Sequence, residues 1–311
     1  MQLLGYDSTL GRVFEHSDAA AKASRSKSNI VDDSSARFEV DQTRSGDARF
    51  RSGLNAEKSV WILSYNNISN FGDRLVTHLA PLVLPPNACV RWIHHKPWDA
   101  PLDETPDLLI LGGGNSVFAP MLTPDLLALL DRTPRKIGVF GTQYRDGFDP
   151  AQMRAVVDRL DTWFARYQDD IELYGRDHPD VRHLGDWLIS LFPMAEATLD
   201  RTLHIGPEVM EVQPMDLLIH RIQSYVRVFS TRLHPLLCAL TSAKVAAYAE
   251  QHESEGLGPS GKLVSMLRDV FGEAPPEQEW WDVDRSAVLA YKRRVAGNVE
   301  GLRTRIGELL A

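Results

Sequence analysis

Hydrophobic runs alternate with segments of helical periodicity from residue 58 onward. Continuous apolar runs are typical of strands in a parallel sheet that is covered on both faces, and apolar residues three or four apart are typical of the covering helices. The predicted strands are 59–65, 88–95, 106–114, 136–142, 162–167 and 181–186, and the predicted helices are 72–83, 124–132, 149–160 and 170–176. This alternation predicts an α/β fold.

A second series of the same kind follows a break near 192–200. Its predicted strands are 202–206, 226–230 and 244–249, its predicted helices are 214–225, 232–243 and 261–272, and a long helix over 284–310 ends the chain. Two such series predict two Rossmann-like domains that face a cleft, with ligands bound at the carboxyl ends of the strands. We assign 58–199 to the N-terminal domain and 200–311 to the C-terminal domain with its terminal helix.

Residues 1–57 differ in composition from the rest of the chain. They are rich in Ser, Asp, Arg and small residues and contain few large apolar side chains. Such a segment buries too little apolar surface to offset the entropy lost on ordering it. We therefore expect a largely disordered or loosely attached arm, and an extra strand or helix docked on the first domain is the alternative.

Charge and composition narrow the classes of partner. The chain carries 34 basic and 42 acidic residues, a net charge of −8, which argues against a broad nucleic-acid surface because phosphate binding needs clustered excess cations. An anionic ligand must then be bound by a few arginines. No signal peptide or apolar stretch of about 20 residues is present, so we expect a cytoplasmic protein. Cys89 and Cys238 lie in apolar runs, which predicts neither a disulfide nor a zinc site.

A polar loop, NNISNFGDRL, follows the first predicted strand. Gly72 lets the backbone approach a ligand, Asp73 can cap the following helix, and the exposed amides around Asn70 can bind an anion or a hydroxyl group. A cap and turn without further function explains the same residues.

The third predicted strand runs into three glycines in LILGGGNSVF. Because the glycines are contiguous and no acidic residue follows about 20 positions later, the segment does not match the dinucleotide fingerprint. Gly113 and Gly114 instead indicate a backbone that passes close to a ligand or to the facing domain, with Asn115 as a partner for a hydroxyl group. A tight strand-to-helix turn is the alternative.

The segment VRVFSTRLHPLL carries the most specific pattern in the chain. Its strand ends at Ser230 or Thr231, either of which can cap the helix, and Arg232 and His234 then lie in the first helical turn. Free N–H groups, the positive end of the helix dipole and a guanidinium group favour an anion. His234 can exchange a proton with a ligand there, and a packing role is the alternative for this histidine.

Three further residues are weaker candidates from the sequence. Arg166 and Asp186 end predicted strands, and Lys262 begins a predicted helix. A salt bridge or a helix cap explains each of them when it is considered alone.

The order of these motifs resembles the polysaccharide pyruvyl transferase family over about residues 60–272. The matching elements are Asn70-Phe71-Gly72-Asp73, Gly112 to Asn115, Ala165-Arg166, Gly185-Asp186 and Ser230 to His234. Tyr167 stands where many family members have Asp. The resemblance implies a fold similar to GT-B glycosyltransferases, with the acceptor on the N-terminal domain and the donor on the C-terminal domain.

The activity that the resemblance implies is transfer of the enolpyruvyl group of phosphoenolpyruvate onto a sugar diol of an exopolysaccharide or cell-wall glycan precursor. The acceptor is then a sugar or a lipid-linked oligosaccharide, which brings peripheral contact with the cytoplasmic face of the inner membrane as an option. No metal or other cofactor is expected, since no step needs one and the sequence shows no ligand cluster.

The resemblance and the chemistry together assign roles to twelve residues. His234 and Asp73 are the expected catalytic residues. Donor-binding residues are Arg232, Arg166, Ser230, Thr231 and Lys262, and acceptor-binding residues are Asn70, Gly72, Gly113, Gly114 and Asn115. A glycosyltransferase with a nucleotide-sugar donor and a non-catalytic glycan-binding relative are the two alternatives.

Overall fold

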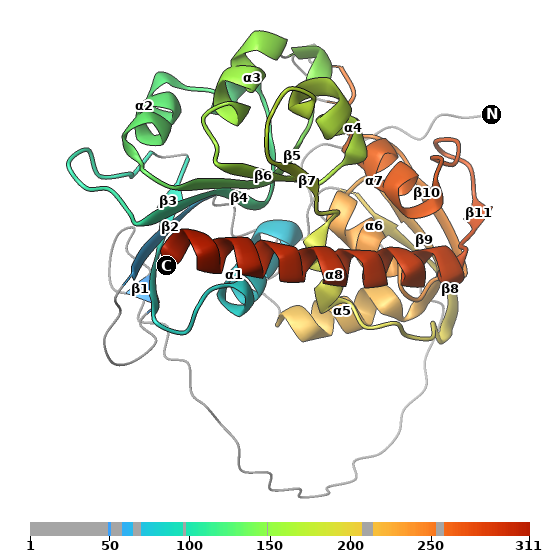
Figure 1. Ribbon diagram of the computed structural model, residues 1–311. Coiled ribbons are helices and arrows are strands. Elements are labelled where there is room, and N and C mark those ends of the chain that lie inside the picture. Colours follow the sequence, from blue (N-terminus) through green and yellow to red (C-terminus); the bar gives the residue numbers. More distant parts are fainter. Residues whose placement is uncertain are drawn as a thin grey trace, which may run out of the picture.

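The computed structural model describes residues 49–50, 58–64, 70–95, 98–147, 149–206, 214–252 and 258–311, with 49–50 and 114–116 described by their backbone only. These residues form an α/β structure with two sheets (Figure 1). The predicted arm lies outside the described residues except for a two-residue strand, β1 (Arg49–Phe50), which pairs with the first sheet.

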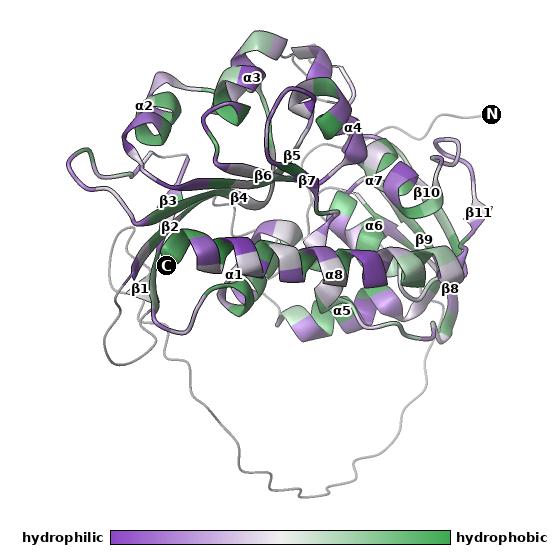
Figure 2. Cartoon of the chain, in the orientation of Figure 1, coloured by the Kyte–Doolittle hydropathy of each residue, from purple (hydrophilic) through white to green (hydrophobic). Residues whose placement is uncertain are grey.

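The first sheet has the strand order β1-β3-β2-β4-β5-β6-β7. Its strands are β2 (Lys58–Ser64), β3 (Ala88–His94), β4 (Leu108–Val117), β5 (Lys136–Thr142), β6 (Thr162–Ala165) and β7 (Val181–His183), which run parallel, while β1 is antiparallel. These strands are mostly hydrophobic along their length, as expected for a sheet buried on both faces (Figure 2).

The second sheet has the order β11-β10-β9-β8. β8 (Leu199–Ile205), β9 (Tyr225–Ser230) and β10 (Val245–Tyr248) are parallel, and β11 (Trp281–Asp282) is antiparallel to β10. The helices are α1 (Phe71–Val83), α2 (Pro124–Arg132), α3 (Pro150–Val157), α4 (Gln168–Asp170), α5 (Met215–Gln223), α6 (Leu233–Leu240), α7 (Lys262–Phe271) and α8 (Arg285–Leu310).

Helices cover both faces of the first sheet. Buried residues of α2 and α3 form one hydrophobic cluster with that sheet, and buried residues of α1 and α8 belong to a second cluster on its other face. The second cluster continues into β9, α6 and α7, because α8 packs against α7 at one end and against α1 further along (Figure 1). A single hydrophobic core therefore contains residues from both halves of the chain.

The predicted α/β class is confirmed, and the predicted strands and helices are found with shifted ends. The exception is the helix predicted over 170–176, where the short α4 is followed by a π-helix (Ile171–Gly175). β8 begins at Leu199, earlier than expected, and α3 ends at Val157, before the predicted end at 160. The sequence pattern missed β1 and β11, since strands of two residues are too short to show periodicity. The division at 199/200 stays a prediction.

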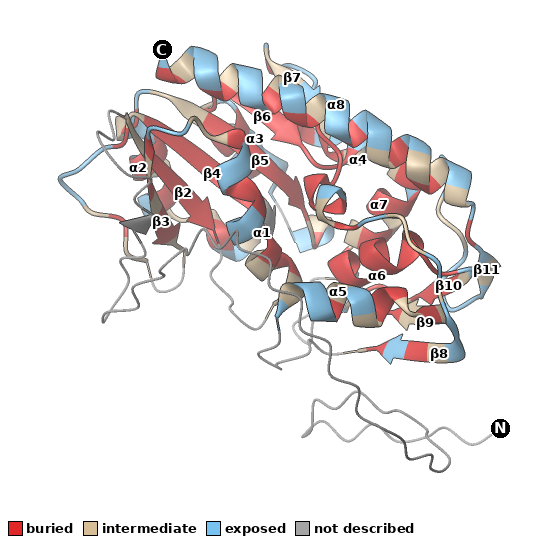
Figure 3. Ribbon diagram, turned by 90° about the horizontal axis from the view of Figure 1, so that it is seen from below, coloured by how far each residue is buried: buried red, intermediate tan, exposed pale blue. Residues whose placement is uncertain are grey.

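α6 is enclosed by the protein, and all eight of its residues are buried (Figure 3). It packs on the strand β9 and also contacts α1. A helix that is apolar all round is stable only inside the protein, so α6 lies at the junction of the two halves.

Among the described residues, none of the helices meets the length and hydropathy that a bilayer span requires. Cys89 and Cys238 are both free thiols.

Candidate active site

The N-terminal turns of α1 and α6 meet where the strands of both sheets end. α1 follows β2, whose neighbours β3 and β4 lie on opposite sides, so the chain reverses direction across the sheet there. α6 follows β9 directly. Such reversal points at the carboxyl ends of parallel strands are where α/β proteins bind ligands. The strand order therefore places the N-terminus of α1 at a reversal point, and the N-terminus of α6 meets it there.

Asn70 is the N-cap of α1, and its Oδ1 atom accepts hydrogen bonds from the N–H groups of Gly72 (2.8 Å) and Asp73 (3.2 Å). The prediction that Asp73 caps this helix is therefore wrong. Asp73 lies within the first turn, where a carboxylate interacts favourably with the helix dipole. Asn70 is preferred as the cap because its side chain precedes the helix and reaches the first free N–H groups.

Gly72 lies directly against the imidazole of His234. A Cβ atom built on Gly72 would lie 1.9 Å from His234 Nδ1 and 2.3 Å from Cε1, well inside van der Waals contact. Any larger residue at this position must displace the ring. The glycine is therefore required by a close approach between α1 and α6, which the sequence reading had attributed to a ligand.

His234 belongs to a buried charged cluster with Asp186 and Arg166, here called the Asp186 cluster. Asp186 Oδ2 lies 3.2 Å from His234 Nε2 and 3.6 Å from Arg166 Nε. The side chains are 0% exposed for Asp186, 4% for Arg166 and 11% for His234. Within the described part of the chain, neither Asp186 Oδ2 nor His234 Nε2 has an aligned hydrogen bond. The cluster thus brings charged groups close together while these two atoms lack aligned hydrogen bonds within the described residues.

The surroundings set the protonation of this cluster. Burial lowers the pKa of His234, Asp186 raises it, and Arg166 and Lys262 lower it further, so the pKa lies below that of an ordinary histidine. Burial raises the pKa of Asp186, but Arg166 and His234 outweigh it and the pKa is lowered. Asp186 is accordingly ionised, and His234 is mostly neutral near pH 7, a state in which it can accept a proton.

The start of α6 differs from the prediction by one residue. Its N-cap is Arg232, which makes no side-chain capping bond, and neither Ser230 nor Thr231 occupies that position. Ser230 Oγ instead accepts a hydrogen bond from Arg232 N (3.0 Å) and donates one to Arg232 O (2.9 Å), which closes the turn before the helix. His234 is then the second helical residue, in the first turn as expected.

Arg232 and Thr231 are directed toward the end of β8. Arg232 Nε donates to Gly206 O (3.3 Å), and Thr231 Oγ1 donates to the same carbonyl (3.4 Å). Arg166 instead faces Asp186. The two arginines predicted to hold one donor therefore have different partners in this structure.

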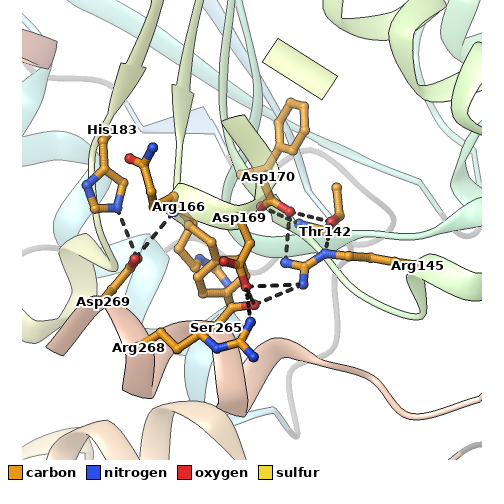
Figure 4. Close-up of polar contacts among 12 residues, drawn as sticks. Thr142, Arg145, Arg166, Asp169, Asp170, His183, Ser265, Arg268 and Asp269 are labelled. Atoms are coloured by element: carbon orange, nitrogen blue, oxygen red, sulfur yellow. Dashed lines mark hydrogen bonds and ion pairs between the residues drawn. The ribbon is translucent and has the colours of Figure 1, made fainter. Parts of the chain in front are cut away.

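Lys262 begins α7 and reaches the first half of the chain, where its Nζ donates to Gln143 Oε1 (3.3 Å). Beside it lies the Arg145 network, formed by Thr142, Arg145, Asp170 and Ser265 (Figure 4). Arg145 donates from Nη2 to Asp170 Oδ1 (2.9 Å), from Nη1 to Ser265 Oγ (2.9 Å) and from Nε to Thr142 Oγ1 (2.9 Å). This network connects the loop after β5 with α7.

The glycine run adopts the backbone that its composition predicts. Gly112 and Gly113 have φ values of 100° and 105°, and a Cβ on Gly112 would lie 2.5 Å from Val139 O. The Gly113 carbonyl accepts a hydrogen bond from Trp187 Nε1 (2.8 Å). The close approach is therefore to neighbouring parts of the protein. The side chain of Asn115 lies outside the described atoms, so its role and that of Gly114 stay predictions.

The structure brings together His234, Arg166 and Gly72 from the predicted set, and it adds Asp186 at their centre. Sequence reasoning ranked Asp186 low because a Gly-Asp pair at a strand end is common, and it missed Arg145 altogether. Only the contact with a histidine 48 positions further on distinguishes Asp186, and no local pattern shows such a contact.

Comparisons with known proteins add no family: no protein-family model matches the chain, and a search of curated proteins finds no match. Among the described residues, no three His, Cys, Asp or Glu side chains gather closely enough to hold a metal ion.

Proposed function

We propose that the protein is a pyruvyl transferase that moves the enolpyruvyl group of phosphoenolpyruvate onto a sugar diol and forms a pyruvate ketal. The observation that carries the proposal is a histidine, His234, held beside the buried carboxylate of Asp186 where two helix N-termini meet. This arrangement combines a group that transfers protons with an environment that attracts an anion.

A positive environment supports an anionic donor. The N-terminal turns of α1 and α6 direct partial positive charge toward the same place, and Arg166 and Lys262 both act electrostatically on His234. Phosphoenolpyruvate carries a phosphate and a carboxylate, which suit such a site. We assign the donor contacts to Arg232 and Lys262 and the support of Asp186 to Arg166.

The acceptor belongs on the first half of the chain in this proposal, beside α1 and the end of β4. Two Rossmann-like halves that face a cleft, as in GT-B enzymes, would then present donor and acceptor to each other. Asp73 orients one acceptor hydroxyl, and the loops that carry Asn70 and Asn115 contribute polar groups. A cytoplasmic location and a lipid-linked acceptor belong to the same proposal.

The reaction asks for proton transfer at two points. One acceptor hydroxyl adds to C2 of the enolpyruvyl group while the methylene carbon gains a proton, and the second hydroxyl replaces phosphate at C2. Two hydroxyl protons are lost, one gained by the methylene carbon and the other leaving with phosphate, so the equation balances. Because His234 is mostly neutral near pH 7, it can take the first proton and, as imidazolium, deliver it to carbon as the general acid.

Ligand binding and turnover test this function separately. Phosphoenolpyruvate should raise the melting temperature more than UDP-glucose or GDP-mannose does, since a bound ligand stabilises the folded state. Phosphate release in the presence of hexosides with free vicinal or 4,6-diols should fall by about 10²–10⁴-fold in His234→Gln. His220→Gln, on an exposed position of α5, is the matched control and should retain activity.

Three results would redirect the assignment. Stabilisation by a nucleotide sugar alone would favour a glycosyltransferase. Binding of a glycan without turnover would favour a non-catalytic relative. Unchanged phosphate release in folded His234→Gln would show that this histidine does not transfer the proton.

A further inference from the structure

One face of α8 contacts three consecutive residues of the loop that carries Asp186. Asn298 Nδ2 donates to Leu184 O (3.2 Å), and the N–H group of Asp186 donates to Tyr291 Oη (2.6 Å). Between them, Val295 packs against Gly185. Positions 291, 295 and 298 lie on one side of a helix, so a single helical face follows the loop residue by residue.

Gly185 shows how closely the loop and α8 approach each other. Its φ is +79°, and a Cβ on it would lie 2.6 Å from Val295 Cγ2 and 3.1 Å from Tyr291 Oη. The positive φ and the short distance both require glycine at this position. Further along, Lys292 Nζ donates to the carbonyls of Ile189 (2.7 Å) and Phe192 (2.5 Å). The backbone from 184 to 192 is thus held along its length by α8.

We propose that Tyr291 is a positioning residue: its hydroxyl holds the backbone of Asp186 so that the carboxylate faces His234. Asp186 is the N-cap of a short 3-10 helix, η4 (Trp187–Leu191), and its Oδ1 atom accepts a hydrogen bond from Leu188 N (3.2 Å). The backbone bond to Tyr291 and this capping bond together set the direction in which Oδ2 lies. The inference rests on the proposed function only in taking His234 as the group that transfers protons.

The phenol suits this role chemically. Tyr291 is 1% exposed, and burial together with Asp269 and Asp186 raises its pKa well above the ordinary value, so the hydroxyl stays neutral. Its removal would leave the buried N–H group of Asp186 without an acceptor, a state that folded proteins avoid by moving the backbone. Movement of the loop would carry the carboxylate away from His234.

The expected consequence is a change in the protonation of His234. Three charged groups act on the ring: Asp186 raises its pKa, while Arg166 and Lys262 lower it. If the ring loses its contact with Asp186, burial and the charges of Arg166 and Lys262 lower the pKa of His234 without opposition from the carboxylate. The pKa of His234 should therefore fall when Tyr291 loses its hydroxyl.

The experiment is an NMR titration of the His234 ring in the full-length chain, assigned with His234→Gln. In Tyr291→Phe the pKa of His234 should fall by roughly half a pH unit or more, and in Asn298→Ala it should fall by less. The control is Thr133→Val, which removes a buried hydroxyl that donates to Leu129 O (2.7 Å). Thr133 precedes β5, about 20 Å of strand away from the site, so the pKa should not change.

The outcomes separate this inference from the proposed function. A wild-type pKa for His234 in folded Tyr291→Phe would overturn the inference, and if that variant does not fold, an unchanged pKa in Asn298→Ala would do so. If Asp186→Asn also left the pKa unchanged, the contact between Asp186 and His234 would itself be wrong. Failure of the wild-type protein to release phosphate from phosphoenolpyruvate would overturn the proposed function, while a lowered pKa in Tyr291→Phe would still support the positioning role.

Discussion

Two buried charged clusters, the Arg145 network and the Asp186 cluster, lie at the junction of the halves. Their carboxylates differ in how fully their oxygens are hydrogen-bonded. In the Arg145 network, the carboxylate of Asp170 accepts from Thr142 N (2.9 Å), Thr142 Oγ1 and Arg145 Nη2, and Arg145 uses Nε, Nη1 and Nη2. In the Asp186 cluster, Asp186 Oδ2 lies near the guanidinium of Arg166 and the mostly neutral ring of His234 and, among the described residues, has no aligned hydrogen bond. Both carboxylates are fully buried, so burial alone does not distinguish them.

The difference indicates different tasks. A buried charge whose hydrogen bonds are satisfied holds its neighbours in one arrangement. A buried charge with an unused acceptor beside a titratable ring is typical of sites where protons move. We therefore take the Arg145 network as a structural connection between the halves and the Asp186 cluster as the candidate centre for the proton transfer that we propose.

The largest expected loss of stability tests the structural role of the Arg145 network. Arg145→Ala removes the cation beside fully buried Asp170 and should lower the free energy of unfolding by about 3–5 kcal/mol, because it leaves an uncompensated buried charge. Urea denaturation measures the loss. A loss below about 1 kcal/mol would show that the network contributes no more than a surface ion pair.

The Asp186 cluster also depends on the close approach of α1 and α6, where Gly72 lies against His234. Gly72→Ala should cost about 1–3 kcal/mol of stability, since the new methyl group overlaps the imidazole. Combining it with His234→Ala should restore part of the loss, because the smaller side chain makes room. A double-mutant cycle measures the coupling, and additive effects within about 0.5 kcal/mol would argue against the contact.

The pH dependence of stability tests the chemical side. Because the pKa of His234 is lowered in the folded state, the unfolded chain binds more protons as the pH falls below about 6.5. The stability that comes from the neutral ring is complete above that pH and is lost as the pH falls toward the folded pKa. Between about pH 7 and 5, wild type should lose stability relative to His234→Gln by up to about 1.4 kcal/mol per pH unit.

The measurement is urea denaturation of both proteins at several pH values. Asp186 does not interfere in this range, because its lowered pKa keeps it ionised in the folded state and its contribution is lost only in stronger acid. Parallel curves for the two proteins would show that His234 titrates as it does in the unfolded chain.

The smallest expected loss of stability is that of an exposed ion pair beside the Arg145 network. Asp169 accepts a hydrogen bond from Ser265 of the Arg145 network (2.7 Å) and pairs with Arg268 at 3.3 Å, but the Arg268 side chain is 55% exposed. Solvent screens such a pair, so Arg268→Ala should lower the free energy of unfolding by less than about 1 kcal/mol. Thermal denaturation alongside Arg145→Ala compares the two arginines. Equal losses would mean that burial does not determine their contributions.

Much of the fold was accessible from periodicity. The α/β class and the positions of β5 and α2 follow from local patterns, because burial on two faces or on one face leaves a repeat in the chain itself. The site was only partly accessible: His234 and Gly72 stand in recognisable turns, whereas the starts of α1 and α6 depended on local hydrogen bonds. Asn70 caps α1 with its side chain, and Ser230 closes the turn before α6 without capping it.

Local patterns predict the alternation of strands and helices, glycines at places of close backbone approach, and a short list of residues able to bind anions or move protons. Which of these residues meet depends on packing. The pairing of Asp186 with His234 spans 48 positions and its bond to Tyr291 spans 105, and both depend on how the sheets and α8 pack. Helical and strand periodicity act over a few residues, whereas burial and electrostatic contact depend on distance in space, so the chemistry of this site emerges only when the chain is folded.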